Sequence, residues 1–357
     1  MGDREYSEPD GKVGRPTSGF RPGLVLDGRY RLESLLGEGG MGTVWVGLQL
    51  ALQRQVAVKS LHVAAASHRT RLRREALALA AVHHPAIVEV YDYGETEGGL
   101  PYLVMELVRG ESVAARLRRL GALDADEAVI LVIQILDGLA VAHRAGVVHR
   151  DIKPDNVMLS FGSSALPKLL DFGIARSEHD GATRLTMDGG FVGTPAYMAP
   201  EQMRGGVTNE RVDVWGVGAL LYHLLAGEAP FGVQDMVVVM RRVLEEPPSY
   251  PRNARGLDGR LWGILTAALR KDPEERTPSA LALRDALAGW LEARGVALPR
   301  ALTASSLPAS AAISPLEPTL LADVEQTAAP ASRRTPAPPN DDAPPSFDLL
   351  IRAKIGR

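Results

Sequence analysis

Apolar and polar positions alternate in short runs over most of the first third of this 357-residue chain. Five runs are rich in β-branched and aromatic residues, which predicts β-strands. The predicted strands are Tyr30–Leu36, Thr43–Leu48, Gln55–Leu61, Ile87–Tyr93 and Tyr102–Leu107. One helix over 68–81 interrupts them, because Leu72, Ala76 and Leu79 recur on one helical face. Ser67 can cap its first turn.

Beyond Gly110 the apolar positions recur with the period of an amphipathic helix. The predicted helices are Ala125–His143, Val212–Ala226, Asp235–Leu244, Leu261–Leu269 and Ser279–Arg294. A short β-like run is seen at 146–148. The order of elements predicts an α+β fold, with a small β-rich N-terminal lobe over about 29–108 and a larger helical C-terminal lobe over about 109–292.

Both ends of the chain have a composition that disfavours folding. Residues 1–28 are rich in glycine, proline and charge, and residues 293–357 are rich in proline and alanine. Neither segment can bury enough apolar surface to offset the entropy of ordering, so both are predicted to be disordered. The most apolar stretch, 212–226, is shorter than the roughly 20 residues that span a bilayer, and no signal peptide is recognisable. We therefore expect no membrane span and a cytoplasmic location.

Charge and cysteine content exclude several classes of function. The chain has 40 Lys and Arg residues against 43 Asp and Glu residues, and its net charge of −3 argues against a dedicated nucleic-acid-binding protein. It contains no cysteine, which excludes disulfides, thiolate metal sites and cysteine nucleophiles. Catalysis would have to use oxygen or nitrogen groups or a bound metal.

A glycine cluster joins the first two predicted strands. Gly37, Gly39 and Gly42 form the pattern G-x-G-x-x-G, and Val44 follows two residues later. A dinucleotide-binding fingerprint leads into a helix, whereas this loop leads into a β-branched run. Two interpretations remain from the residues alone: an ordinary hairpin, or a flap whose backbone N–H groups approach phosphate oxygens.

Lys59 lies within the apolar run 56–59, where an unpaired ammonium would be costly. Glu75 is the one acidic residue between Lys59 and Ala81, and we expect it to be the partner. An internal ion pair without any ligand is the structural alternative.

Two further segments carry carboxylates in a pattern typical of phosphoryl transfer. In 149–156, Asp151 could orient a hydroxyl, Lys153 could neutralise a transferring phosphoryl group, and Asn156 offers an oxygen to a metal. Asp171 in the Asp-Phe-Gly segment 171–173 is a second oxygen ligand of the kind that Mg²⁺ prefers. Taken alone, Asp-Phe-Gly is compatible with an ordinary turn.

The ordered set of motifs resembles the signature of the eukaryotic-type serine/threonine protein kinase family, in its bacterial style. The set comprises the glycine cluster, the lysine strand, Glu75, the segments 149–156 and 171–173, and Ala199-Pro200-Glu201. The resemblance covers about residues 29–292 and implies a two-lobed protein kinase fold. It implies transfer of the γ-phosphoryl group of ATP, with Mg²⁺ or Mn²⁺, to protein hydroxyls.

Residue roles follow from the resemblance. It implies an ATP site formed by Leu36, Gly37, Glu38, Gly39, Gly40, Met41, Gly42, Thr43, Val44, Ala57, Lys59, Met105, Glu106, Val108 and Met158. Lys59, held by Glu75, would grip the phosphates, while Asn156 and Asp171 would hold the metal. The resemblance implies an internal spine of Leu79, Val90, His149 and Phe172, and structural roles for Asp213 and for a pair of Glu201 with Arg276.

Substrate class and regulation are also implied. Lys153 and the segment 193–198 resemble the serine/threonine branch rather than the tyrosine branch. Thr186, with Thr183 as a secondary site, is the expected autophosphorylation site, and Arg150 and Arg176 would bind the phosphate. Thr194 would stay unmodified.

Two alternative functions and one open segment remain. A catalytically inactive pseudokinase scaffold would usually lack one of the four residues Lys59, Asp151, Asn156 and Asp171. A small-molecule phosphotransferase is disfavoured by 199–201. The expected partners are protein substrates and a transient second copy, and residues 1–25 and 300–357 are expected to be dispensable for chemistry. Phe347, Leu350, Ile351 and Lys354 could share one face of a docking helix, with a frayed terminus as the default.

Overall fold

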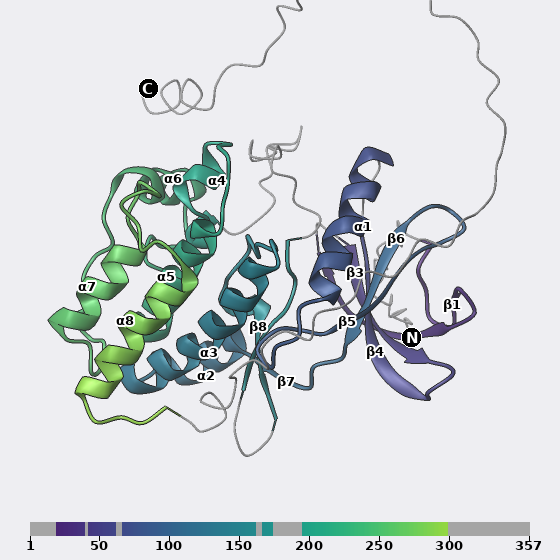
Figure 1. The fold of residues 1–357 in the computed structure, drawn as a ribbon, viewed down its shortest axis with the longest axis horizontal. Coiled ribbons are helices and arrows are strands. Elements are labelled where there is room, and N and C mark those ends of the chain that lie inside the picture. The colour runs from purple at the N-terminus through teal and green to yellow at the C-terminus, as the bar shows by residue number, and fades with distance from the viewer. Residues whose placement is uncertain (1–18, 40–41, 62–65, 162–165, 174–194, 299–357) are drawn as a thin grey trace, which may run out of the picture. The chain divides into compact units, whose positions relative to one another are not determined.

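A computed structural model describes residues 19–39, 42–61, 66–161, 166–173 and 195–298. Within them the predicted α+β organisation is confirmed, because a six-stranded sheet with one helix precedes a mostly helical region. Figure 1 shows the sheet and α1 grouped together, and α2 to α8 grouped beside the short strands β7 and β8.

The N-terminal sheet is antiparallel throughout, in the order β1-β2-β3-β4-β6-β5. Its strands are β1 Val25–Leu26, β2 Tyr30–Gly39, β3 Gly42–Gln49, β4 Arg54–Ser60, β5 Val90–Glu95 and β6 Pro101–Glu106. A cluster that includes Trp45, Val56 and Tyr102 fills one face of the sheet. This burial holds together the strands that carry the glycine cluster and Lys59.

Four of the five predicted strands are confirmed within a few residues, and the fifth begins later than predicted. β5 starts at Val90 instead of Ile87, because the residues before it pair elsewhere. Ile87 forms a parallel bridge with Leu169, and the Val88 N–H donates to the Leu169 carbonyl at 3.0 Å. Residues 86–88 are thus attached to the C-terminal lobe rather than to the sheet.

The folded part extends ahead of the boundary expected at residue 28. Residues 19–28 are described, and β1 pairs with β2. Phe20 is 2% exposed and belongs to the same apolar cluster as Trp45. A single aromatic side chain with Leu26 supplies the burial that the composition of 1–28 did not suggest.

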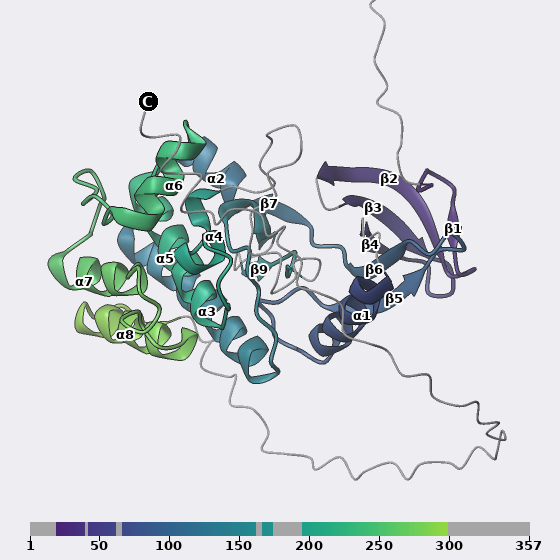
Figure 2. The same cartoon turned by 90° about the horizontal axis from the view of Figure 1, so that it is seen from above.

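The helix predicted at 68–81 is α1, Ala66–Ala80. Leu72, Ala76 and Leu79 are buried as predicted, and the helix lies against the sheet in both views (Figures 1 and 2). The helix begins at Ala66, one residue ahead of Ser67, and the predicted cap depends on a side chain that lies outside the described part of the structure.

The C-terminal lobe contains all five predicted helices. The helices are α2 Val113–Leu120, α3 Ala125–Arg144, α4 Pro200–Met203, α5 Arg211–Ala226, α6 Met236–Glu245, α7 Gly259–Ala268 and α8 Ala280–Ala293, with 3₁₀ turns η1 Pro154–Asn156 and η2 Pro195–Tyr197. α5 is buried almost all round, which explains its unbroken apolar sequence.

A short three-stranded sheet was not predicted. It consists of β7 Gly110–Ser112, β8 Val157–Ser160 and β9 Pro167–Leu169. β8 directly follows the candidate catalytic segment 149–156, and β9 ends just before the segment 171–173. The β-like run at 146–148, in contrast, forms no strand. Among the helices of the described residues, none is long and apolar enough to cross a membrane.

Candidate active site

A pocket lies where the sheet meets the helical lobe. Its empty space, the open solvent at its mouth included, is about 550 Å³. It is lined by Lys59, Leu61, Leu79, Val88, Val90, Leu103, Met105, Asp151, Asp171, Phe172 and Gly173. Four of these were predicted as site residues: Lys59, Met105, Asp151 and Asp171. The lining residues Leu61, Val88 and Leu103 were missed, although they lie two residues from the predicted Lys59, Val90 and Met105.

Lys59 has a different partner from the one predicted. Its ammonium lies 2.9 Å from Asp171 Oδ1, and Glu75 Oε1 lies 3.7 Å from Arg150 Nη1 instead. Among the described ion pairs, none joins Lys59 to Glu75, so the predicted pairing is wrong for this structure. The physical reason is that Asp171, far away in sequence, reaches the ammonium from the other lobe, and the nearby guanidinium of Arg150 attracts Glu75.

The segment 151–156 folds back on itself around the Asp151 carboxylate. Lys153 Nζ donates to Asp151 Oδ2 at 3.0 Å, and Asn156 Nδ2 donates to the same oxygen at 2.9 Å. Asn156 Nδ2 also donates to the Asp151 carbonyl at 2.7 Å. The amide nitrogen of Asn156 therefore faces Asp151. The amide oxygen of Asn156 points the other way, which leaves it available as a metal ligand.

Asp213 on α5 holds the backbone just before Asp151. Its Oδ2 accepts from the His149 N–H at 2.8 Å and contacts His143 Nε2 at 2.8 Å, and its Oδ1 accepts from the Arg150 N–H at 2.7 Å. Burial alone would raise the pKa of Asp213, but the hydrogen bond and charge of His143 hold this pKa below its ordinary value. The carboxylate is thus a fixed anchor for the backbone, consistent with the structural role implied by the resemblance.

His149 is buried and packs, as the resemblance implied, within the spine. Its ring lies 4.5 Å from that of Phe172 between centroids. Nε2 contacts the Leu170 carbonyl at 2.7 Å, and Nδ1 accepts from the Asp151 N–H at 3.2 Å. Because Nδ1 accepts a hydrogen bond and Nε2 faces a carbonyl, the geometry places the ring proton on Nε2, and burial lowers the pKa of His149. Leu79 and Val90, the other spine residues, are also buried.

The residues predicted to surround adenine gather only in part. Ala57 and Met105 form a buried apolar cluster against which Val44 and Val108 pack. Leu36 is 53% exposed. Met158 lies on β8, and Glu106 ends β6. The remaining flap residues Gly37, Glu38, Gly39, Gly42 and Thr43 lie on β2 and β3, while Gly40 and Met41 lie outside the described residues.

Gly42 is required for a reason that the motif did not suggest. Its φ is +144°, and a Cβ there would lie 1.8 Å from the Ser60 carbonyl oxygen. Gly37 and Gly39, in contrast, face open space. The third glycine of the motif therefore allows β3 to approach β4 closely, next to Lys59.

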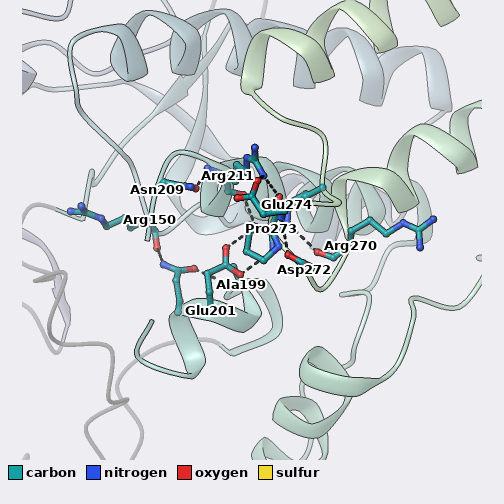
Figure 3. Close-up of polar contacts among 11 residues, drawn as sticks. Arg150, Ala199, Glu201, Asn209, Arg211, Arg270, Asp272, Pro273 and Glu274 are labelled. Atoms are coloured by element: carbon teal, nitrogen blue, oxygen red, sulfur yellow. Dashed lines mark hydrogen bonds and ion pairs between the residues drawn. The ribbon is translucent and has the colours of Figure 1, made fainter. Parts of the chain in front are cut away.

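Glu201 and Arg276 form a buried, bidentate ion pair, as the resemblance implied. Arg276 Nη1 and Nη2 donate to the two Glu201 carboxylate oxygens at 2.7 and 2.9 Å. Arg276 also donates to the carbonyls of Arg270 and Arg211 at 3.1 and 2.8 Å. Figure 3 shows the polar contacts in this region. The pair fixes α4 to the rest of the helical lobe.

The predicted regulatory residues Arg176, Thr183 and Thr186, together with Thr194, lie outside the described residues. The same is true of the possible docking segment at 347–354.

Comparison with known proteins gives consistent matches. A family model described as protein kinase domain matches residues 30–286. The serine/threonine-protein kinase PknB of Mycobacterium tuberculosis is 39% identical over 266 residues, which cover 72% of this chain and 42% of that protein. The serine/threonine-protein kinase pkn2 of Myxococcus xanthus is 42% identical over 274 residues, covering 74% of this chain and 33% of that protein.

A third relative, the serine/threonine-protein kinase PksC of Streptomyces coelicolor, is 38% identical over 287 residues, covering 77% of this chain and 50% of that protein. The matched region therefore spans half or less of the length of these relatives.

Proposed function

The chain belongs to the protein kinase family, and we propose that it is a serine/threonine protein kinase that transfers the γ-phosphoryl group of ATP to protein hydroxyls, its own included. The observation that carries the proposal is the convergence of Lys59, Asp151 and Asp171 on one pocket, with Asn156 bonded to Asp151. These residues come from both lobes and from separate motifs, so their meeting is a property of the fold.

The family uses ATP and a divalent metal ion, and the donor set of this site suits that use. Asn156 and Asp171 offer amide and carboxylate oxygens, which are the ligands that Mg²⁺ and Mn²⁺ prefer. Two protein ligands are typical when phosphate oxygens complete the coordination. We propose that Asn156 and Asp171 hold the ion, which would neutralise charge on the transferring group.

The remaining roles follow from position and charge. Lys59, on β4, would bind the phosphates. Val44, Ala57 and Met158 would pack against the adenine ring, and the backbone of 106–108 would bind its edge. The Asp151 carboxylate would orient the attacking hydroxyl and accept its proton. Lys153, which donates to Asp151, would stabilise negative charge on the phosphoryl group in transit.

We further propose that Thr186, and secondarily Thr183, are autophosphorylated and that Arg150 and Arg176 bind the phosphate. A phosphate adds about −1.5 to −2 charges and forms strong hydrogen bonds with guanidinium groups. Arg150 already attracts a carboxylate, Glu75. The activation expected from preincubation with ATP should be lost in Thr186→Ala and largely kept in Thr183→Ala.

The alternative is a pseudokinase scaffold, which binds nucleotide without transfer. Two measurements separate it from the enzyme. Mg-ADP should raise the melting temperature in both cases, whereas mass spectrometry after incubation with Mg-ATP should find phosphoserine and phosphothreonine only for the enzyme. A nucleotide-dependent melting shift without any phosphorylation would favour the scaffold, and phosphotyrosine as the main product would refute the substrate class. Cytoplasmic location and transient self-association remain predictions, which fractionation and cross-linking can test.

A further inference from the structure

The short helix α4 is anchored to the helical lobe and contacts the catalytic segment 149–156. Glu201 in its first turn is held by both terminal nitrogens of Arg276, whose side chain is 0% exposed. Arg276 is itself fixed by the carbonyls of Arg270 and Arg211. α4 is therefore fixed relative to the core of the helical lobe, and it can hold in place the residues that it contacts.

Gln202, next to Glu201, links α4 to the catalytic segment 149–156. Its Oε1 accepts from the Ala199 N–H at 3.0 Å, which caps the start of α4. Its Nε2 donates to the Arg150 carbonyl at 3.0 Å. The two partners require opposite ends of the amide, so its orientation is determined. Figure 3 shows Arg150 joined in this way to the residues around Ala199 and Glu201.

Arg150, whose carbonyl accepts this bond, has a strained backbone conformation and lies directly before Asp151. Arg150 has a φ of +65°, a left-handed conformation that non-glycine residues rarely adopt. The Arg150 carbonyl and the Asp151 N–H belong to one peptide group, and that N–H donates to His149 Nδ1 at 3.2 Å. Gln202 thus fixes the oxygen side of a peptide whose nitrogen side His149 fixes. On the other side of Arg150, Asp213 accepts its N–H.

We propose that Gln202 is a positioning residue for the phosphoryl transfer, acting through the Arg150 carbonyl to hold the Asp151 carboxylate in place. The proposal rests on the proposed function, because it assigns Asp151 the catalytic role. It adds a link from α4 to the catalytic segment that the family motifs do not assign. Loss of the donor would let the peptide between Arg150 and Asp151 rotate, and small displacements of a reacting group reduce rates strongly.

Two substitutions separate the two bonds of Gln202. Gln202→Glu keeps an acceptor for the Ala199 N–H and loses the donor to Arg150. Gln202→Lys keeps a donor and loses the acceptor, and a third variant, Gln202→Met, loses both without adding charge. We expect kcat for Ser/Thr phosphorylation to fall about tenfold in the Glu and Met variants and to stay within about threefold of the wild type in the Lys variant. The KM for ATP should change less than about twofold, because Gln202 does not line the pocket.

Hydrogen exchange supplies a readout that does not need activity. Peptides that contain residues 149–151 should exchange faster in Gln202→Glu and Gln202→Met than in Gln202→Lys. An unchanged kcat in Gln202→Glu, or equal losses in the Glu and Lys variants, would overturn the inference, since the second result would show that only the helix cap matters. If the wild type transfers no phosphoryl group, the proposed function fails, while the exchange comparison still decides whether Gln202 holds the peptide.

Discussion

Replacing Arg276 by Met should be among the most destabilising single changes in the helical lobe. The guanidinium makes four hydrogen bonds to protein oxygens, two of them to Glu201, and its carbon lies 5.2 Å from the Trp215 ring centroid. The side chains of Arg276 and Glu201 are 0% and 12% exposed. Removing one partner of such a pair leaves a buried, uncompensated charge.

The expected cost follows from that burial. Breaking a buried ion pair from one side costs about 3–5 kcal/mol, whereas exposed pairs contribute about 0.2–1 kcal/mol. Because domains are stable by only about 5–15 kcal/mol, Arg276→Met should remove a large share of the free energy of unfolding. Arg276→Lys should cost less, since it keeps the charge but loses the bidentate geometry.

Denaturation in guanidinium chloride, followed by tryptophan fluorescence, measures this free energy. Arg284→Met is the matched control, because Arg284 pairs with Asp137 in the same lobe at 27% and 20% exposure. We expect the control to lose less than about 1.5 kcal/mol. A loss for Arg276→Met that does not exceed that of the control would refute the reasoning, because burial would then not determine the cost.

Three further predictions concern other regions. Lys168 lies on β9 opposite Met158 of β8, and its ammonium pairs with Glu106 at the end of β6. Lys168→Met should therefore raise the KM for ATP about three- to tenfold with little change in kcat. Lys168→Arg, which keeps the charge, should leave the KM unchanged, and steady-state kinetics measure both variants. Phe20→Ala should lower the free energy of unfolding by about 3 kcal/mol in the same denaturation assay, because Phe20 is buried under the sheet; a change below about 1 kcal/mol would contradict a contribution of this side chain to the core. Burial and then the charge of Arg276 lower the pKa of Lys271 to about 7 from the ordinary 10.5, so the unfolded chain binds more protons above pH 7. The free energy of unfolding of the wild type should therefore rise relative to Lys271→Met between pH 7 and pH 9, by less than about 1.4 kcal/mol per pH unit because the side chain is partly exposed, and a falling difference would contradict this sign.

Local patterns predicted the elements whose residues decide their own structure. The periodicity of 212–226 predicted α5, and the motif spacing assigned Asp151 and Asn156 to one site, where their side chains are hydrogen-bonded in the structure. The motif glycines predicted a strand-joining loop. These features depend on neighbours within a few residues, which a sequence displays directly.

The features that were missed depend on contacts between distant segments. Glu75 was the nearest acid to Lys59 in sequence, but the choice between Glu75 and Asp171 depends on how α1 lies relative to β9 and to the residues just after β9. The bond from Gln202 to Arg150 likewise joins residues whose proximity no local pattern displays. The burial of Phe20 was missed because the glycine-rich composition of 1–28 outweighs one aromatic residue.

The central claim is that this site transfers phosphoryl groups by means of Asp151, and the transfer rate tests it most directly. The measurement is the initial rate of incorporation of the γ-phosphoryl group of ATP into serine and threonine by the wild type, by Asp151→Asn and by the control Asp285→Asn, on the exposed side of α8. We predict incorporation by the wild type and the control, and a rate lowered about 10²–10⁴-fold in Asp151→Asn, with an unchanged melting temperature and ADP affinity. No incorporation by the wild type, or a near-wild-type rate in Asp151→Asn, would contradict the account.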